Sequence, residues 1–103
     1  MKIDFINYKI FFIEINKKTK SIDFTKKFNL HWEDFPEFHP EEAGCISKEN
    51  VSYIIFNNKN SLSIITHEII HAVDHIFERY GFKNDDTELR AFLVGYILNR
   101  YLR

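Results

Sequence analysis

Residues 61–80 constrain the fold of this chain most strongly, because their apolar positions repeat with the period of an α-helix. Ser61 is a suitable N-cap at one end of the segment, and Gly81 is a suitable C-cap at the other. The apolar positions on one side of the helical wheel are Leu62, Ile65, Ile69, Val73, Ile76 and Tyr80. The sequence therefore predicts one amphipathic helix with two defined ends.

The opposite side of this helix carries the motif His67-Glu68-Ile69-Ile70-His71, flanked by Asp74 and Glu78. Residues four apart lie on one face of a helix, so two imidazoles can converge on one tetrahedral zinc ion. Glu68 lies beside the first His, where it can take a proton from a water that the metal acidifies to a pKa of about 7. The motif predicts two zinc ligands, His67 and His71, and a general base, Glu68. The alternative is a surface helix that carries these residues by chance, which the capped helical context disfavours.

Composition indicates one folded domain over residues 1–103. Hydrophobic residues make up 45% of the chain and include eleven Phe, which is enough for a packed core. The net charge of −1 lacks the basic footprint of a nucleic-acid-binding protein. The one cysteine, Cys45, excludes an intrachain disulfide and fits a reducing compartment. We expect it to be a half-buried core residue, with a role as fourth metal ligand as the alternative.

Hydropathy argues against a membrane protein. No stretch approaches the roughly 18 apolar residues of a membrane span, and the N-terminus does not have the pattern of a signal peptide. We therefore expect a cytoplasmic protein that contacts neither membrane nor nucleic acid. The oligomeric state stays open.

The first half of the chain predicts a small β-sheet. Two segments are rich in Ile and Phe, Lys2–Phe5 and Lys9–Ile15. Together they predict a β-hairpin whose turn lies near Asn7. Ser21–Phe24 can add a short strand. Residues 29–44 hold both Pro and five acidic residues, which predicts a long irregular loop.

The second half predicts a strand followed by two helices. Ser52–Phe56 is β-branched and aromatic and stops at two Asn residues. After the motif helix, Gly81–Asp86 reads as a turn, and Asp85 or Asp86 caps a second helix that reaches about Leu102. The predicted class is α+β, with a small antiparallel or mixed sheet followed by two C-terminal α-helices.

A catalytic zinc site normally has three protein ligands, so the motif needs one more. His75 and Glu78 lie one and two turns beyond His71, and turns about 5.4 Å apart cannot all reach one ion comfortably. Asp74 is better placed to orient a histidine than to ligate. The remaining candidate is Glu88.

Glu88 falls in the first turn of the second helix, after the chain reverses direction. It shares one stripe of that helix with Ala91, Gly95 and Asn99, and the two small residues would allow a close approach to another helix. If this stripe faces the motif helix, Glu88 points toward the His pair. The alternative is a carboxylate that simply favours the helix N-terminus.

These residues together resemble the gluzincin branch of the zincin metallopeptidases, and most closely its very short members encoded by bacteriophages and other mobile elements. The resemblance covers about residues 44–102. It comprises the strand Ser52–Phe56, the motif His67–His71, and the later segment Glu88-Leu89-Arg90-Ala91-Phe92. It implies a minimal zincin-like fold, zinc bound by His67, His71 and Glu88, and Glu68 as general base. No residue matches the family's oxyanion-stabilising Tyr or His; His31, His39 and Tyr96 are candidates.

Two functions from different classes are compatible with this pattern. The first is a zinc metallopeptidase whose peptide or protein substrate adds to an edge strand near Ser52–Phe56. The second is a non-catalytic zinc-binding protein on the same scaffold, such as a phage-particle component or a host-modulating factor, in the host cytoplasm or the virion. Small size favours the second function. Retention of Glu68 favours the first, because a structural metal site needs no base.

Overall fold

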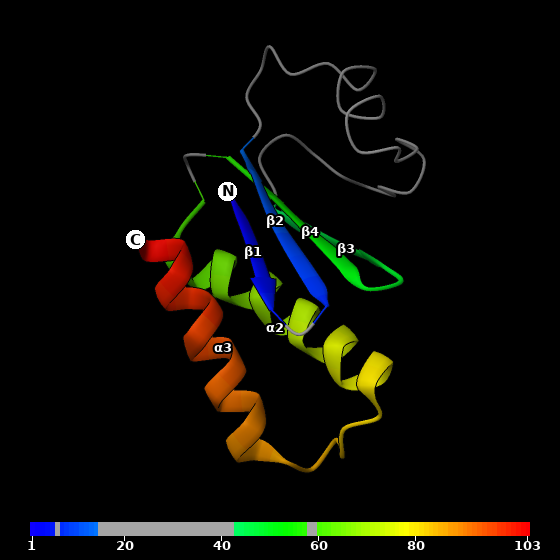
Figure 1. Ribbon diagram of the computed structural model, residues 1–103. Helices are drawn as coiled ribbons and strands as arrows, with labels where there is room; N and C mark the ends of the chain where they lie inside the picture. Colours follow the sequence, from blue (N-terminus) through cyan, green and yellow to red (C-terminus); the bar gives the residue numbers. More distant parts are fainter. Residues whose placement is uncertain (6, 15–42, 58–59) are drawn as a thin grey trace.

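The structure is a computed structural model that describes residues 1–5, 7–14, 43–57 and 60–103 (Figure 1). It has a four-stranded sheet followed by two C-terminal helices, which confirms the predicted α+β class. In chain order the elements are β1 (Lys2–Phe5), β2 (Tyr8–Glu14), β3 (Gly44–Lys48), β4 (Val51–Phe56), α2 (Leu62–Tyr80) and α3 (Thr87–Leu102).

The sheet is mixed, with the strand order β1-β2-β4-β3. β1 and β2 form an antiparallel hairpin, as predicted, and Asn7 in its turn has a φ of 60°. β3 and β4 form a second antiparallel hairpin, and β2 pairs with β4 in parallel. The two hairpins are therefore joined side by side through one parallel pair.

The prediction of an edge strand near Ser52–Phe56 is wrong, because β4 lies between β2 and β3. Among the described strands, the edge beside β4 is formed by β3, whose first residue, Gly44, belonged to the predicted loop. This strand has little sequence signal because it is short and contains Gly, Cys and Ser. Glu49, with a φ of 54°, helps to close the turn between the two strands. Residues 29–42 of the predicted loop, and the predicted strand Ser21–Phe24, lie outside the described residues.

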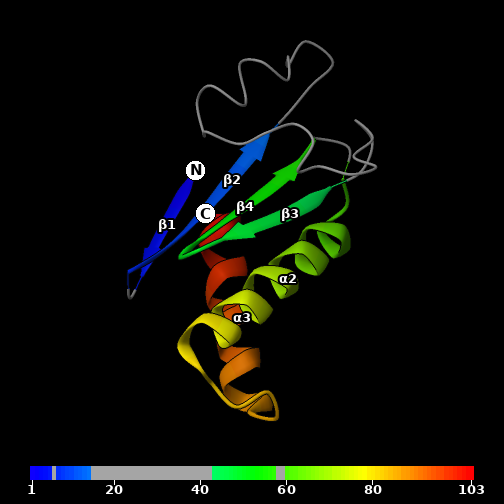
Figure 2. The ribbon, with the colours of Figure 1, turned by 90° about the vertical axis from the view of Figure 1, so that its right-hand side faces the viewer.

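α2 lies across one face of the sheet, with α3 beside it (Figures 1 and 2). Alternate residues of the central strands point toward the helices, so Ile10 and Phe12 of β2 and Ile54 of β4 are buried there. The helices contribute the other half of the core. The buried residues from α2 and α3 are Ile65, Ile69, Ala72, Val73, Ile76, Phe77, Leu93 and Ile97.

The predicted caps of α2 are confirmed. The Ser61 Oγ accepts a hydrogen bond of 3.4 Å from the backbone N–H of Ile64. Gly81 ends the helix in the left-handed region, at a φ of 68°, which suits a residue without a Cβ. The buried face is shifted from the predicted one: Leu62 is 49% exposed, whereas Phe77 is buried and packs its ring on Phe82.

The second helix begins as predicted, with the Asp86 carboxylate accepting a hydrogen bond from the Leu89 N–H. Its small-residue stripe, however, does not face α2. Glu88, Ala91 and Asn99 are exposed, and a Cβ on Gly95 would meet nothing within 4 Å. The prediction fails because Leu93 and Ile97 bury more apolar surface than Ala or Gly could, and they take the inward side.

Neither helix in the described part of the chain is both long and apolar enough to cross a lipid bilayer.

We predict that Ile69→Ala lowers the free energy of unfolding by about 2–5 kcal/mol, because it leaves a cavity in the core. The adjacent Ile70→Ala is the matched control, since Ile69 is fully buried whereas Ile70 is 41% exposed. Ile70→Ala should cost under about 1 kcal/mol. Urea denaturation of both variants measures the difference, and equal losses would contradict the described rotation of α2.

Candidate functional site

The two histidines of the motif lie together on the exposed face of α2. The Nε2 atoms of His67 and His71 are 3.1 Å apart, and their rings meet edge to face with centroids 4.7 Å apart. Two Zn–N bonds of about 2.0–2.1 Å at a tetrahedral angle hold their nitrogens about 3.3 Å apart. The observed spacing therefore fits two ligands of a single zinc ion.

Glu68 lies beside this pair but points inward. It is only 7% exposed, although it is charged, and it contributes to the wall of a pocket. Burial raises the pKa of Glu68, while the charges of His67 and His71 act in the opposite direction. Within the described residues, no hydrogen bond engages its carboxylate. A carboxylate in the pocket wall without a hydrogen-bond partner among the described residues, next to a metal-compatible His pair, is chemically suited to accept a proton from a bound molecule.

The pocket has a volume of about 390 Å³ and lies between α2 and the edge strand β3. All of its lining residues come from these two elements. They are Cys45 and Ser47 of β3, and Glu68, His71, Asp74, His75 and Glu78 of α2. The strand that sequence analysis missed therefore forms one wall of the candidate site.

A chain of hydrogen bonds connects this wall to the core. The fully buried Tyr8 hydroxyl lies 2.6 Å from His75 Nδ1 and 2.5 Å from Ser52 Oγ, which in turn lies 2.7 Å from Ser47 Oγ. Cys45 Sγ lies 3.7 Å from Ser47 Oγ. The chain links β2, β4, β3 and α2, so it holds the His75 ring in one orientation.

The groups in this chain are held in their neutral forms. Burial lowers the pKa of His75, an effect that Arg79 reinforces and Glu78 opposes. Burial raises the pKa of Tyr8, although hydrogen bonds to Ser52 and Ser47 oppose it. Burial also raises the pKa of Cys45 to about 12, so the thiol stays protonated at neutral pH. This half-buried Cys matches the expectation of a core residue.

Asp74 forms a salt bridge with Arg90 of α3. The Arg90 guanidinium also lies 4.3 Å from the centroid of the Phe77 ring and donates to the carbonyl oxygen of Asn84. Asp74 was expected to orient a histidine, but its described partner is this arginine. The ion pair brings the first turn of α3 beside α2, one helical turn beyond His71.

Glu88 lies in that same first turn of α3, two residues before Arg90, and it is exposed. Across residues 1–5, 7–14, 43–57 and 60–103, no three His, Cys, Asp or Glu side chains are arranged to hold a metal ion. The structure thus brings His67, His71 and Glu68 together and leaves Glu88 apart from them.

The oxyanion candidates do not contribute to the described site. Tyr96 is partly exposed on α3, where it stacks on Phe92, and it does not line the pocket. His31 and His39 lie outside the described residues. Sequence reasoning missed the pocket role of His75, because that role depends on Tyr8, which lies 67 residues away in the chain.

Comparison with protein-family models, with curated proteins and with solved structures finds no match to this chain.

We predict that Tyr8→Phe lowers the free energy of unfolding by about 1–3 kcal/mol, because it removes the hydroxyl that hydrogen-bonds to both Ser52 and His75. Tyr101→Phe is the matched control, since the Tyr101 ring packs on Phe12 while its hydroxyl bonds to no other described residue. Thermal or urea unfolding measures both changes. A Tyr8→Phe variant as stable as Tyr101→Phe would contradict the described network.

Proposed function

We propose that this protein is a zinc-dependent metallopeptidase of the gluzincin type. The observation that carries the proposal is the combination of a His pair with Nε2 atoms 3.1 Å apart and a buried Glu68 in the adjoining pocket. Two imidazoles at that spacing suit zinc, and a buried carboxylate beside them suits a general base. Among the described residues, Glu68 forms no salt bridge with a Lys or Arg.

His67 and His71 would hold the metal together with Glu88. Glu88 lies in the first turn of α3, which the Asp74–Arg90 ion pair keeps beside α2. Glu88 is exposed, so its side chain can change rotamer without loss of packing. When bound, zinc would act as a Lewis acid on the scissile carbonyl and lower the pKa of a water molecule.

Glu68 would perform the proton transfers of peptide hydrolysis. Its carboxylate accepts a proton as water attacks the scissile carbonyl carbon, and it then delivers that proton to the nitrogen of the leaving amine. Its place in the pocket wall fits both steps, because Glu68 and His71 line the same pocket between α2 and β3.

The edge strand β3 offers the binding surface for an extended peptide. Among the described strands it pairs with β4 alone, so the backbone groups on its other side can bond to an added strand. Cys45 and Ser47 of β3 line the pocket, so a peptide on this edge would run past Glu68. The lone cysteine suits a reducing cytoplasm.

The alternative is a non-catalytic zinc-binding interaction protein, favoured by one surface feature. Phe92 is 66% exposed on α3 and stacks on Tyr96, which is also exposed. Exposed aromatic pairs of this kind are common in protein–protein interfaces. This function would need the fold and the metal but not the base.

We predict one zinc ion per chain, with occupancy reduced at least tenfold in His71→Ala and Glu88→Ala, because each removes one of three ligands. Glu14→Ala, which removes an exposed acid of β2, is the control and should keep full occupancy. Elemental analysis of the purified variants provides the measurement. Full zinc occupancy in Glu88→Ala would show that Glu88 is not a ligand. Asp74 and His75 would then be the next candidates for the third ligand.

We predict that Glu68→Gln retains zinc and fold but loses at least about 10²–10⁴-fold in kcat, since Gln keeps the shape and removes the base. Glu49→Gln, on the β3–β4 turn, is the control and should leave turnover unchanged. Cleavage of a broad peptide library, with zinc content measured in parallel, tests this. Undiminished turnover in Glu68→Gln would refute the mechanism, and a wild type that cleaves no peptide would favour the interaction protein.

A further inference from the structure

The three acidic residues that line the pocket, Glu68, Asp74 and Glu78, differ in their ion pairing. Asp74 is neutralised by Arg90. Glu68 and Glu78 form no salt bridge or carboxylate hydrogen bond with another described residue, and Glu68 is more than nine-tenths buried and lines the pocket. No Lys or Arg is among the lining residues. Two acidic groups, the buried Glu68 and the exposed Glu78, therefore line the pocket without an ion pair to any described Lys or Arg.

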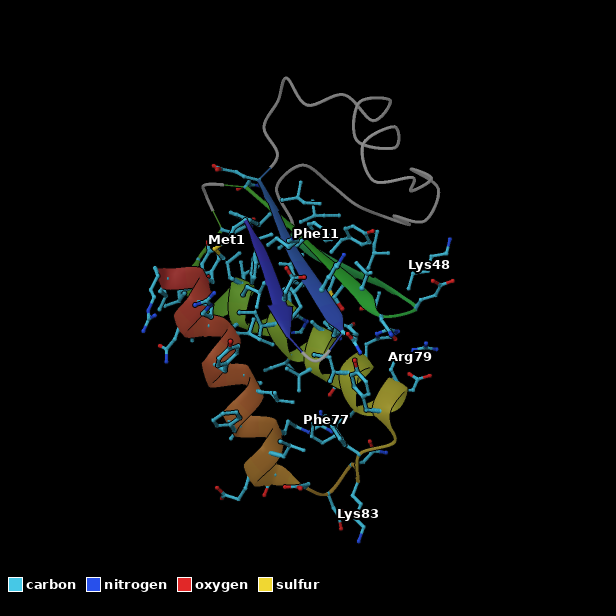
Figure 3. All side chains as sticks on the ribbon, viewed as in Figure 1. Met1, Phe11, Lys48, Phe77, Arg79 and Lys83 are labelled. Carbon is cyan, nitrogen blue, oxygen red and sulfur yellow. The ribbon has the colours of Figure 1, made fainter. Side chains whose placement is uncertain are left out.

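The arginine next to Glu78 in the sequence, Arg79, binds a residue outside the pocket lining. Arg79 follows Glu78 in the chain, but its Nε donates a 3.0 Å hydrogen bond to Asn50 Oδ1 in the β3–β4 turn. Figure 3 shows Arg79 at the end of α2 that lies below this turn. This hydrogen bond links α2 to the β3–β4 hairpin. The Arg79 guanidinium is therefore bound outside the pocket and is not one of its lining groups.

Three other residues of the wall, His75, Cys45 and Ser47, carry little charge. His75 is held by Tyr8, and burial lowers its pKa, so it carries little positive charge at neutral pH. Cys45 and Ser47 on the facing strand are uncharged, since burial raises the pKa of the thiol to about 12. The wall therefore does not offset the negative charge of Glu78.

The two free carboxylates lie at different distances from the His pair. Glu68 is inside the motif, whereas Glu78 is seven residues beyond His71, about 10 Å along the helix axis. A group bound at the His pair can reach Glu78 only through a long side chain that runs along the pocket past His75 and Ser47.

We propose that this pocket selects substrates with a long cationic side chain, Lys or Arg, next to the scissile bond, and that Glu78 binds the charged end of that side chain. The inference rests on the proposed peptidase function and adds its substrate class. The Glu78 carboxylate accepts hydrogen bonds from the ammonium or guanidinium group, which are stronger than bonds between neutral groups. Glu78 is thus a specificity-determining residue, outside the proposed metal ligands.

The test uses the full-length, zinc-loaded protein and matched peptides that differ at one position. Arginine is compared with citrulline, which has the same shape without the charge, at each site flanking the scissile bond. The wild type should cleave the arginine peptide with a kcat/KM roughly tenfold higher, the ratio expected for a hydrogen bond to a charged group. Glu78→Gln should abolish this ratio, and Glu78→Lys should shift the preference to a glutamate-containing peptide.

Asp4→Asn is the charge-matched control, because it removes one acid from β1, at the opposite edge of the sheet from β3. It should retain the arginine preference. Zinc content and thermal unfolding show that the Glu78 variants are folded and loaded.

The possible failures are distinct. This inference would be wrong if the wild type cleaved both peptides equally, or if the arginine preference persisted in Glu78→Gln. Neither result would contradict the proposed peptidase function. A zinc-loaded wild type that cleaves no member of a broad library would overturn both.

Discussion

The burial of one face of α2 against β3 and β4 is the constraint on which the site depends. Ile65, Ile69 and Ile76 are almost completely buried, and this fixes the rotation of the helix about its own axis. With that rotation set, the His pair faces outward and Glu68 turns toward β3. A change of about 100° in this rotation, one residue of helical phase, would exchange the exposed and buried groups of the motif. The hydrophobic core therefore determines the chemistry of the surface.

The polar chain behind the pocket complements this apolar contact. Hydrophobic burial is non-directional, whereas the hydrogen bonds of Tyr8 with Ser52 and His75 depend on geometry. They hold β2, β4 and α2 at one separation, and the hydrogen bond between Ser52 and Ser47 extends the chain to β3, which forms the other wall of the pocket. Because the partners are neutral, the chain adds little charge beside the pocket, so the acidic groups dominate its electrostatics.

Local patterns in the sequence were sufficient to predict α2, its caps Ser61 and Gly81, the first hairpin and the N-terminus of α3. Each of these is determined by residues within a few positions of one another. β3 could not be predicted, because its pairing partner rather than its own composition makes it a strand. The inward face of α3 was predicted wrongly, since competition between Leu93 and the small-residue stripe is decided by tertiary packing. The His pair and Glu68 followed from helical spacing, whereas the pocket wall around His75 depended on contacts between distant segments.

The parallel pairing of β2 with β4 has a consequence for how the protein folds. Lys9 aligns with Val51, so this part of the sheet forms only when distant parts of the chain meet. Contacts of such high sequence separation require a large loss of chain entropy, and they form slowly compared with helices. α2 can therefore become helical well before its inner face is covered and before Tyr8 reaches His75. The newly made chain would carry the motif on a helix while its pocket is still absent, so competence for binding or chemistry would appear as one of the last events of folding.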